Sequence, residues 1–296
     1  MIKLLNSSSF LAAAFSRDKY TVEYYFYKHM HIRKYKNSTI LDYTSIYKRY
    51  IVKYAKLHIK KINRHVVEQI CKDISHLYCN SQRHVISLFR CILQCAVVDK
   101  KIKKNIFDEI KMKRRQPKKE PHPFTKQEIN LLLNNANGWF RNFLAFLFFT
   151  GMRIGEVAAL DWEDINEESI YVTKHIYKNV IDAPKTYNPR RVPLLRELKT
   201  FIRDQKKITK TGRIFPNVKG ACSLFYRWHA LLRKCGMENN RILYQTRHTF
   251  AITALDKGVK ISELCYILGH SNPDMLYKHY ARYIEPLKFT NFSVLK

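Results

Sequence analysis

Acidic residues are scarce in this chain, and their scarcity narrows the chemistry that the chain can perform. The 296 residues include 24 Asp and Glu but 54 Lys and Arg, which gives a formal net charge of +30. The few carboxylates form no sequence cluster of the kind that holds a pair of catalytic metal ions. The excess of positive charge favours a polyanionic partner, with nucleic acid ahead of an anionic membrane surface. The alternative is a lysine-rich soluble protein whose charge serves no particular partner.

Long apolar runs and paired cysteines are also missing. No stretch is long enough to span a bilayer, and residues 1–15 lack the basic start and the small-residue cleavage site of a signal peptide. The seven cysteines are scattered without a CxxC pair, and no histidine lies at metal-ligand spacing beside them. We therefore expect a cytoplasmic protein with reduced thiols, no cofactor, no metal and no membrane partner.

The first 112 residues indicate a short extension followed by a helical domain. Within the extension, residues 1–37, every second position from Tyr20 to Phe26 is apolar or aromatic, which indicates a short strand. The extension is expected to pack on the surface of the next domain. Residues 38–112 show helical periodicity, most clearly in the apolar stripe of residues 81–99. Basic residues occupy the other helix faces: Lys48, Arg49, Lys53, Lys56, Lys60, Lys61 and Arg83.

A basic, proline-containing segment divides the chain. Residues 113–123 read KRRQPKKEPHP, where proline disfavours helix and the charges favour an extended backbone and phosphate contact. We expect this segment to be a linker between the helical domain and a second domain of residues 124–296.

The second domain is expected to be mainly helical with a small β component. Thr125 and Glu128 form a capping box before one helix, and residues 139–149 form a very apolar second one. Strand-like pieces follow at residues 169–173, 175–178 and 191–194, and a short helix at residues 261–268 should end at Gly269. The whole chain is therefore assigned to the α+β class, mainly α with a small β-hairpin or sheet.

Four motifs in this domain suit chemistry on a phosphodiester. Arg153 lies at a helix start after a glycine turn, Arg247 lies in an Arg-His pair, His270 follows a Leu-Gly turn, and Tyr280 lies ten residues later. Arginine presents a planar fork of donors to phosphate oxygens, and a phenol surrounded by cations can act as a nucleophile. The alternative for Arg153 is a surface ion pair with Glu156.

Together these motifs resemble the tyrosine recombinase, or phage integrase, family. The resemblance implies a helical core-binding domain and a catalytic domain that form a clamp around DNA. It also implies a catalytic lysine in a β-hairpin just before an arginine-rich strand that ends in Pro-Leu. Lys185 matches this position, ahead of residues 190–194, whereas Lys174 and Lys178 are nearby alternatives. In some integrases an arm-binding module comes first, and residues 1–37 are either its vestige or a surface extension.

The resemblance further implies a site-specific recombinase that needs neither metal nor ATP. Arg153 and Arg247 would bind the phosphate, His270 would add a hydrogen bond, and Lys185 would protonate the leaving oxygen. Tyr280 would form a 3′-phosphotyrosyl link. The implied partners are double-stranded DNA, three further copies of the chain in a homo-tetramer, and an accessory DNA-bending protein.

One position departs from the family pattern. Where most relatives have His or Lys three residues before the second arginine, this chain has Tyr244. Its hydroxyl can donate to phosphate but cannot act as a near-neutral base. The proton of the nucleophile would therefore pass to His270 or to water. His248, which follows the second arginine, would have a structural role. Two alternatives remain: a type IB topoisomerase, which uses nearly the same residues to relax DNA, and a catalytically silent DNA-binding relative, which the departure at Tyr244 keeps open.

The nucleophile itself is ambiguous by periodicity. Tyr277, Tyr280 and Tyr283 lie three residues apart, so all of them can face one side of a helix. The family places its tyrosine nine or ten residues after the histidine. Tyr280 lies ten after His270 and is therefore the expected nucleophile.

Overall fold

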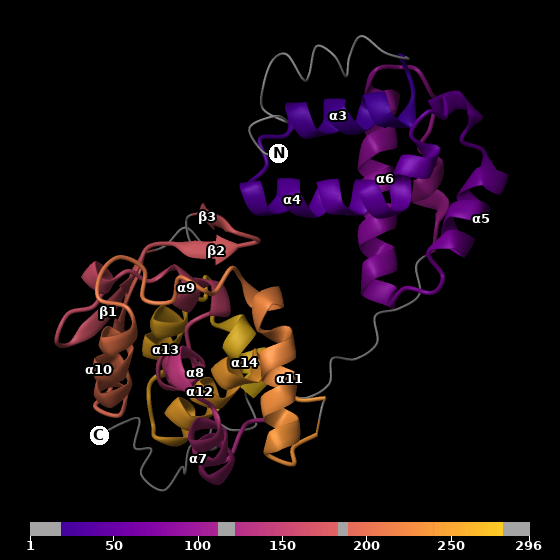
Figure 1. Cartoon of the computed structure of the whole chain (residues 1–296). Coiled ribbons are helices and arrows are strands. Elements are labelled where there is room, and N and C mark those ends of the chain that lie inside the picture. The colour runs from indigo at the N-terminus through magenta and orange to yellow at the C-terminus, as the bar shows by residue number, and fades with distance from the viewer. Residues whose placement is uncertain (1–18, 112–121, 183–188, 239, 281–296) are drawn as a thin grey trace, which may run out of the picture. The chain divides into compact units, whose positions relative to one another are not determined.

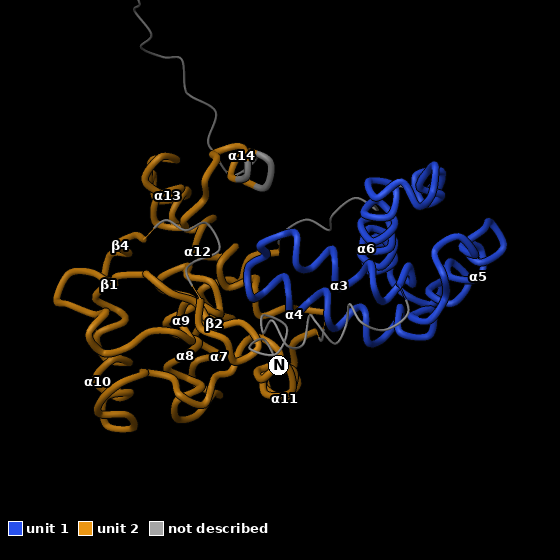
Figure 2. The backbone as a smooth tube through the Cα atoms, turned by 90° about the horizontal axis from the view of Figure 1, so that it is seen from above, with its two compact units in different colours: residues 1–118 blue, residues 119–296 orange. Residues whose placement is uncertain are grey.

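The computed structural model describes residues 19–111, 122–182, 189–238 and 240–280 (Figure 1). The chain divides into two compact units, residues 1–118 and residues 119–296 (Figure 2). Helices predominate in both units, and the two small sheets that are described lie in the second. The expected linker, residues 113–123, falls mostly outside the described residues.

The first unit is built around its longest helix. The apolar stripe expected in residues 81–99 is confirmed, because Val85, Phe89, Ile92 and Ala96 are buried along this helix. The rings of Phe89 and Phe107 stack on each other within this core. The helices are α3 (Val22–Ile32), α4 (Asn37–Ile46), α5 (Arg64–Asp73) and α6 (Cys79–Val98). Short π and 3-10 turns lie between α4 and α5, at Tyr47–Ile51, Val52–Tyr54 and Ile59–Lys61, and after α6, at Ile106–Glu109.

The strand expected near residues 20–26 is wrong, because these residues begin α3. Thr21 caps the helix by accepting a hydrogen bond from the backbone N–H of Tyr24 at 3.2 Å. The buried side chains are Val22, Tyr25, Phe26 and His29, which have the spacing of one helical face. Aromatic residues on several sides of this helix imitate a period of two. Since α3 packs on α6 and supplies core residues, it is an integral part of the first unit rather than a surface addition.

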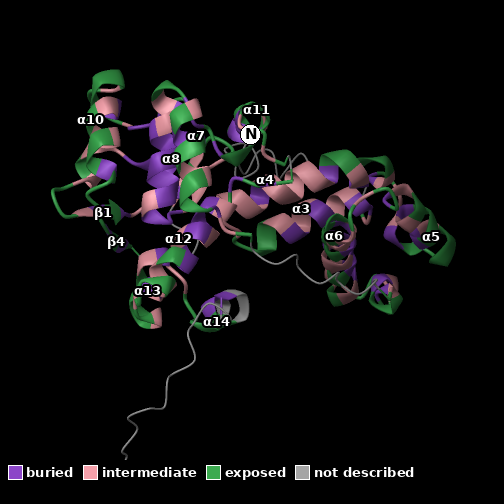
Figure 3. Ribbon diagram, turned by 90° about the horizontal axis from the view of Figure 1, so that it is seen from below, coloured by how far each residue is buried: buried purple, intermediate pink, exposed green. Residues whose placement is uncertain are grey.

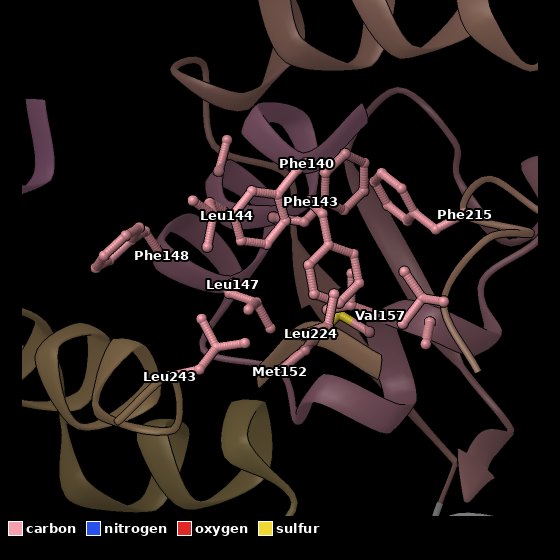
Figure 4. Packing of buried hydrophobic residues seen from close by; sticks show 14 of the residues in the cluster. Phe140, Phe143, Leu144, Leu147, Phe148, Met152, Val157, Phe215, Leu224 and Leu243 are labelled. Carbon is pink, nitrogen blue, oxygen red and sulfur yellow. The ribbon is translucent and has the colours of Figure 1, made fainter. Parts of the chain in front are cut away.

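The second unit is organised around α8 (Gly138–Thr150). This helix is apolar on nearly every side, as befits a helix in the middle of a core. Figure 3 shows its buried residues, and Figure 4 shows Phe143 and Leu147 packed among side chains from other elements, including Phe215. Around α8 lie α7 (Lys126–Asn135), α9 (Ile154–Ala159), α10 (Leu198–Ile208) and α12 (Gln245–Asp256). The capping box of Thr125 and Glu128 is confirmed at the start of α7.

Two antiparallel strand pairs complete this unit. Strand β1 (Ser169–Val172) pairs with β4 (Arg190–Pro193), and β2 (His175–Tyr177) pairs with β3 (Val180–Asp182). Lys178 and Asn179 connect β2 to β3 with positive φ values of 47° and 67°, as a tight two-residue hairpin turn requires. Strand β3 was not expected from the sequence.

The last described helices form a smaller packed group. These helices are α13 (Ile261–Leu268) and α14 (Asp274–Tyr280), whereas α11 (Phe225–Lys234), which precedes α12, packs in the main core of the unit. α13 has the expected bounds. Leu264 and Leu268 of α13 share a hydrophobic cluster with Leu276 and Tyr280 of α14 and with Ala251 of α12. This cluster fixes α14 against α12. In the part of the chain that the structure describes, no helix has both the length and the apolarity to cross a membrane.

Candidate functional site

Three arginines from distant segments gather around one buried carboxylate. Arg153 caps α9 and Arg190 begins β4, while Arg247 lies in the first turn of α12. Glu156 accepts hydrogen bonds from Arg190 Nη2 at 2.7 Å and from Arg190 Nη1 at 3.1 Å. It also accepts from Arg153, through Nη1 and through the backbone N–H, both at 2.9 Å. Arg153 therefore does pair with Glu156, as the alternative supposed, but the pair does not lie at the surface, because Glu156 is only 1% exposed.

The charges of this cluster do not cancel. Burial by itself raises the pKa of Glu156, but the hydrogen bonds and charge of Arg190, with the charges of Arg153 and Arg247, lower it to about 2. Burial and the charge of Arg153 lower the pKa of Arg247 to about 10. Glu156 and Arg247 are therefore both ionised near neutral pH. Three positive charges face one negative charge, so the site is suited to an anion.

Carbonyl oxygens in the turn after α13 accept hydrogen bonds from two of these arginines. Arg247 Nη2 donates to the carbonyl oxygen of Leu268 at 2.6 Å, and Arg153 Nη1 donates to the same oxygen at 3.4 Å. Arg153 Nη2 donates to the carbonyl of Gly269 at 3.2 Å. Arg247 Nη1 donates to the carbonyl of Gly151 at 2.8 Å. Because carbonyl oxygens are neutral, these bonds orient the guanidinium groups without removing their charge.

Gly269 gives this turn its shape. It ends α13 in the left-handed region, with φ of +65°. A Cβ at this position would lie 2.9 Å from Arg190 Nη1 and 3.0 Å from Arg190 Cζ. Glycine therefore serves two requirements here, the helix stop and the close approach of a buried guanidinium.

His270 is joined to this cluster through Arg247. Its Nε2 atom lies 2.9 Å from Arg247 Nη2. A guanidinium can only donate, so Nε2 accepts and the hydrogen of a neutral imidazole lies on Nδ1. The structure thus brings together Arg153, Arg247 and His270, which the sequence had suggested separately.

Tyr280 lies against α12, where it contacts His248. Its ring is 3% exposed, and its hydroxyl forms a short hydrogen bond with His248 Nδ1. Burial raises the pKa of the Tyr280 phenol, although the charge of Arg247 opposes that effect. Tyr277 is 50% exposed, so the two phenols do not share one environment. Tyr283 lies outside the described residues.

Tyr244 and the lysines complete the list of expected site residues. Tyr244 is 39% exposed, and its ring makes an edge contact with the His248 ring at a centroid distance of 5.3 Å. Lys185 lies outside the described residues, between β3 and β4 in the chain. Lys174 forms ion pairs with Asp161 and Asp164, which leave it poorly placed to serve as the catalytic acid.

The basic residues expected on the helices of the first unit are largely at the surface. Lys48, Arg49, Lys56, Lys60 and Lys61 are exposed. Lys53 is also exposed and forms an ion pair with Asp73, whereas Arg83 is partly buried. Most of this charge therefore meets solvent, where it is available to a polyanion.

Sequence reasoning gave no functional role to three residues that the site contains. Glu156 was considered only as a surface partner, Arg190 only as part of a strand pattern, and His248 only as a brace. The one local signal concerned His248, which lies four residues after Tyr244 and thus on the same side of a helix. Within the described residues, no three His, Cys, Asp or Glu side chains gather as a metal site requires.

The sequence identifies the family. Residues 123–285, more than half of the chain, match the phage integrase family, and the chain belongs to this family. The prophage integrase IntR of Escherichia coli (strain K12) is 28% identical over 244 residues, covering 71% of this chain and 59% of IntR. The chain spans 50 to 59% of the length of several curated relatives that it matches.

Solved integrases have the same fold. The Tn1549 transposon integrase, in complex with a circular intermediate DNA, has a TM-score of 0.73 at 20% identity, covering 88% of this chain and 95% of that one. A lambda integrase tetramer bound to a Holliday junction has a TM-score of 0.69 at 15% identity, covering 90% and 82%. The expected resemblance to tyrosine recombinases and the expected fold class are confirmed.

Proposed function

We propose that this chain is a site-specific DNA recombinase that cleaves and rejoins strands through a phosphotyrosyl intermediate. The observation that carries the proposal is the convergence of Arg153, Arg247 and His270 on the turn after α13, with Tyr280 packed on α12. A phosphodiester is a suitable anion for such a site, since guanidinium donors match its oxygens. Membership of the phage integrase family supports the same reaction class.

The proposed reaction is an in-line exchange at phosphorus. Arg153 and Arg247 bind the non-bridging oxygens and stabilise the charge that develops in the transition state. His270 donates to the phosphate through the hydrogen on Nδ1. The Tyr280 oxygen bonds to phosphorus while the bond to the 5′-oxygen breaks, and Lys185 protonates that leaving oxygen. A 5′-hydroxyl of a partner strand reverses the step, so bond energy is conserved without ATP or metal.

Tyr244 takes the place of the family's usual His or Lys in this proposal. Its phenol is partly exposed at the beginning of α12 and interacts electrostatically with Arg247. We propose that the hydroxyl donates one hydrogen bond to the phosphate.

We propose that the substrate is double-stranded DNA and that the working form is a tetramer. The solved relatives support this view, because the Tn1549 integrase was captured on a circular intermediate DNA and lambda integrase as a tetramer on a Holliday junction. Exposed lysines and arginines of the first unit would add contacts to DNA phosphates.

The decisive experiment is a covalent selection from a library of duplexes. Protein–DNA adducts are isolated under denaturing conditions, the attached DNA is sequenced, and a nicked suicide substrate is built on the sequence recovered. The wild-type protein should form an adduct on this substrate, in EDTA as well as in Mg²⁺. Tyr280→Phe should form none while still binding DNA, and Tyr277→Phe should retain the adduct.

Four other outcomes would each contradict one part of the proposal. An adduct in Tyr280→Phe that maps to a neighbouring tyrosine would overturn the choice of nucleophile. The absence of any adduct with the wild-type protein would favour the catalytically silent alternative. Relaxation of supercoiled DNA without a partner site would favour a topoisomerase. Loss of cleavage in EDTA, restored by Mg²⁺, would contradict the metal-independent mechanism.

A further inference from the structure

The His248 ring contacts the rings of two tyrosines of the candidate site, Tyr244 and Tyr280. Tyr244 and His248 are four residues apart at the beginning of α12, and their rings make an edge contact. Tyr280 reaches the same imidazole from α14, with its hydroxyl hydrogen-bonded to Nδ1 and its ring centroid 5.7 Å from that of His248. The expected nucleophile is therefore in direct contact with a group that can exchange a proton.

The chemistry of Tyr280 requires such a group. A phenol has a pKa near 10 in water, and burial raises the pKa of Tyr280 further. Very little of it is consequently ionised near neutral pH. A buried phenol that attacks phosphorus must therefore transfer its proton to a neighbour as the new bond forms.

The other candidate bases are placed less well. His270 Nε2 accepts a hydrogen bond from Arg247. This hydrogen bond would have to break before Nε2 could take a proton from Tyr280. Tyr244 cannot serve as a near-neutral base, because a neutral hydroxyl oxygen is a much weaker proton acceptor than an imidazole nitrogen. His248, by contrast, is hydrogen-bonded through Nδ1 directly to the Tyr280 oxygen.

We propose that His248 is the general base of the cleavage step, an inference that rests on the proposed recombinase function. As the Tyr280 oxygen bonds to phosphorus, its proton passes to His248 Nδ1, and the bond to the 5′-oxygen breaks. The leaving oxygen takes a proton from Lys185, so one proton is lost and one gained at the reacting atoms. In the rejoining step the imidazolium returns its proton to Tyr280. The chain thus replaces the base that position 244 lacks with an imidazole one helical turn further along.

The test separates proton transfer from positioning. His248→Asn keeps a hydrogen-bonding atom near the position of Nδ1 but cannot accept a proton at neutral pH. We expect it to slow single-turnover adduct formation on the nicked substrate about 100-fold, within the range of general-base catalysis. DNA affinity and thermal unfolding are measured alongside and should stay close to those of the wild-type protein. His248→Ala should regain part of its rate in added imidazole.

A 5′-bridging phosphorothiolate substrate provides the matched control. A thiolate leaves without protonation, so this substrate should restore Lys185→Ala but not His248→Asn. Adduct formation by His248→Asn within about twofold of the wild-type rate, or its restoration by the phosphorothiolate, would overturn the inference. The absence of an adduct with the wild-type protein would instead refute the recombinase proposal itself, so the two failures can be told apart.

Discussion

Glu156 is the buried carboxylate that Arg153 and Arg190 share. Replacing it with glutamine removes the negative charge and leaves Arg190, which is 2% exposed, without its ion-pair partner. Breaking a buried pair from one side costs about 3–5 kcal/mol, so we expect Glu156→Gln to lower the unfolding temperature by roughly 10 °C. Glu167→Gln is the matched control, because Glu167 is exposed. Equal unfolding temperatures for the two variants would contradict the role assigned to Glu156.

The pH dependence of stability should report the same carboxylate. Its pKa lies at about 2 in the folded chain, below the usual 4.5, so its contribution is present above pH 4.5 and is lost as the pH falls toward 2. The difference in unfolding free energy between wild type and Glu156→Gln should therefore narrow on acidification. Urea unfolding at a series of pH values measures that difference. A constant gap down to about pH 3 would argue against an ionised Glu156.

Tyr244 offers a second test at a single residue. If its hydroxyl donates to the phosphate, Tyr244→Phe should lower the single-turnover cleavage rate about tenfold, as for the loss of one charge-assisted hydrogen bond. Tyr244→His should retain or raise the rate. Tyr226→Phe is the control, because that phenol is 83% exposed on α11. Full activity in Tyr244→Phe would mean that only the ring is needed, through its contact with His248.

The turn that ends α13 can be tested as an element. Gly269 and Gly258 both have positive φ, of +65° and +80°, but only Gly269 faces Arg190. Gly258→Ala should cost about 1 kcal/mol of unfolding free energy, for a left-handed alanine. Gly269→Ala should cost at least about 2 kcal/mol more, because Arg190 must move out of a buried ion pair. Urea unfolding measures both changes, and equal costs would show that the turn does not depend on the Arg190 contact.

The net charge of +30 belongs to the whole molecule. If exposed basic residues contact DNA phosphates, binding should release many counterions, and log K should fall steeply and linearly with log salt. For about six or more contacts the affinity should drop at least 1,000-fold between about 50 mM and 200 mM salt. An anisotropy titration at several salt concentrations gives the slope. A nearly flat salt dependence would rule out extensive phosphate contact.

Features that depend on neighbouring residues were determined by the sequence itself. The capping box of Thr125 and Glu128 predicted the start of α7, and Gly269 predicted the end of α13. The apolar stripe of α6 was equally clear. Capping, glycine stops and apolar periodicity involve residues within one or two helical turns, so they can be recognised without a structure. The same local reasoning failed for α3, where aromatic residues on several faces concealed the buried one.

Tertiary structure decided which functional groups meet. Arg190 and Glu156 lie 34 residues apart in the chain, and His248 and Tyr280 lie 32 apart. Periodicity placed Tyr277 and Tyr280 on one side of α14, but the structure exposes the first and buries the second. That difference arises because the cluster of α12, α13 and α14 fixes how α14 docks. Residue spacing within one helix contains no information about such docking, because it depends on side chains supplied by the other two helices.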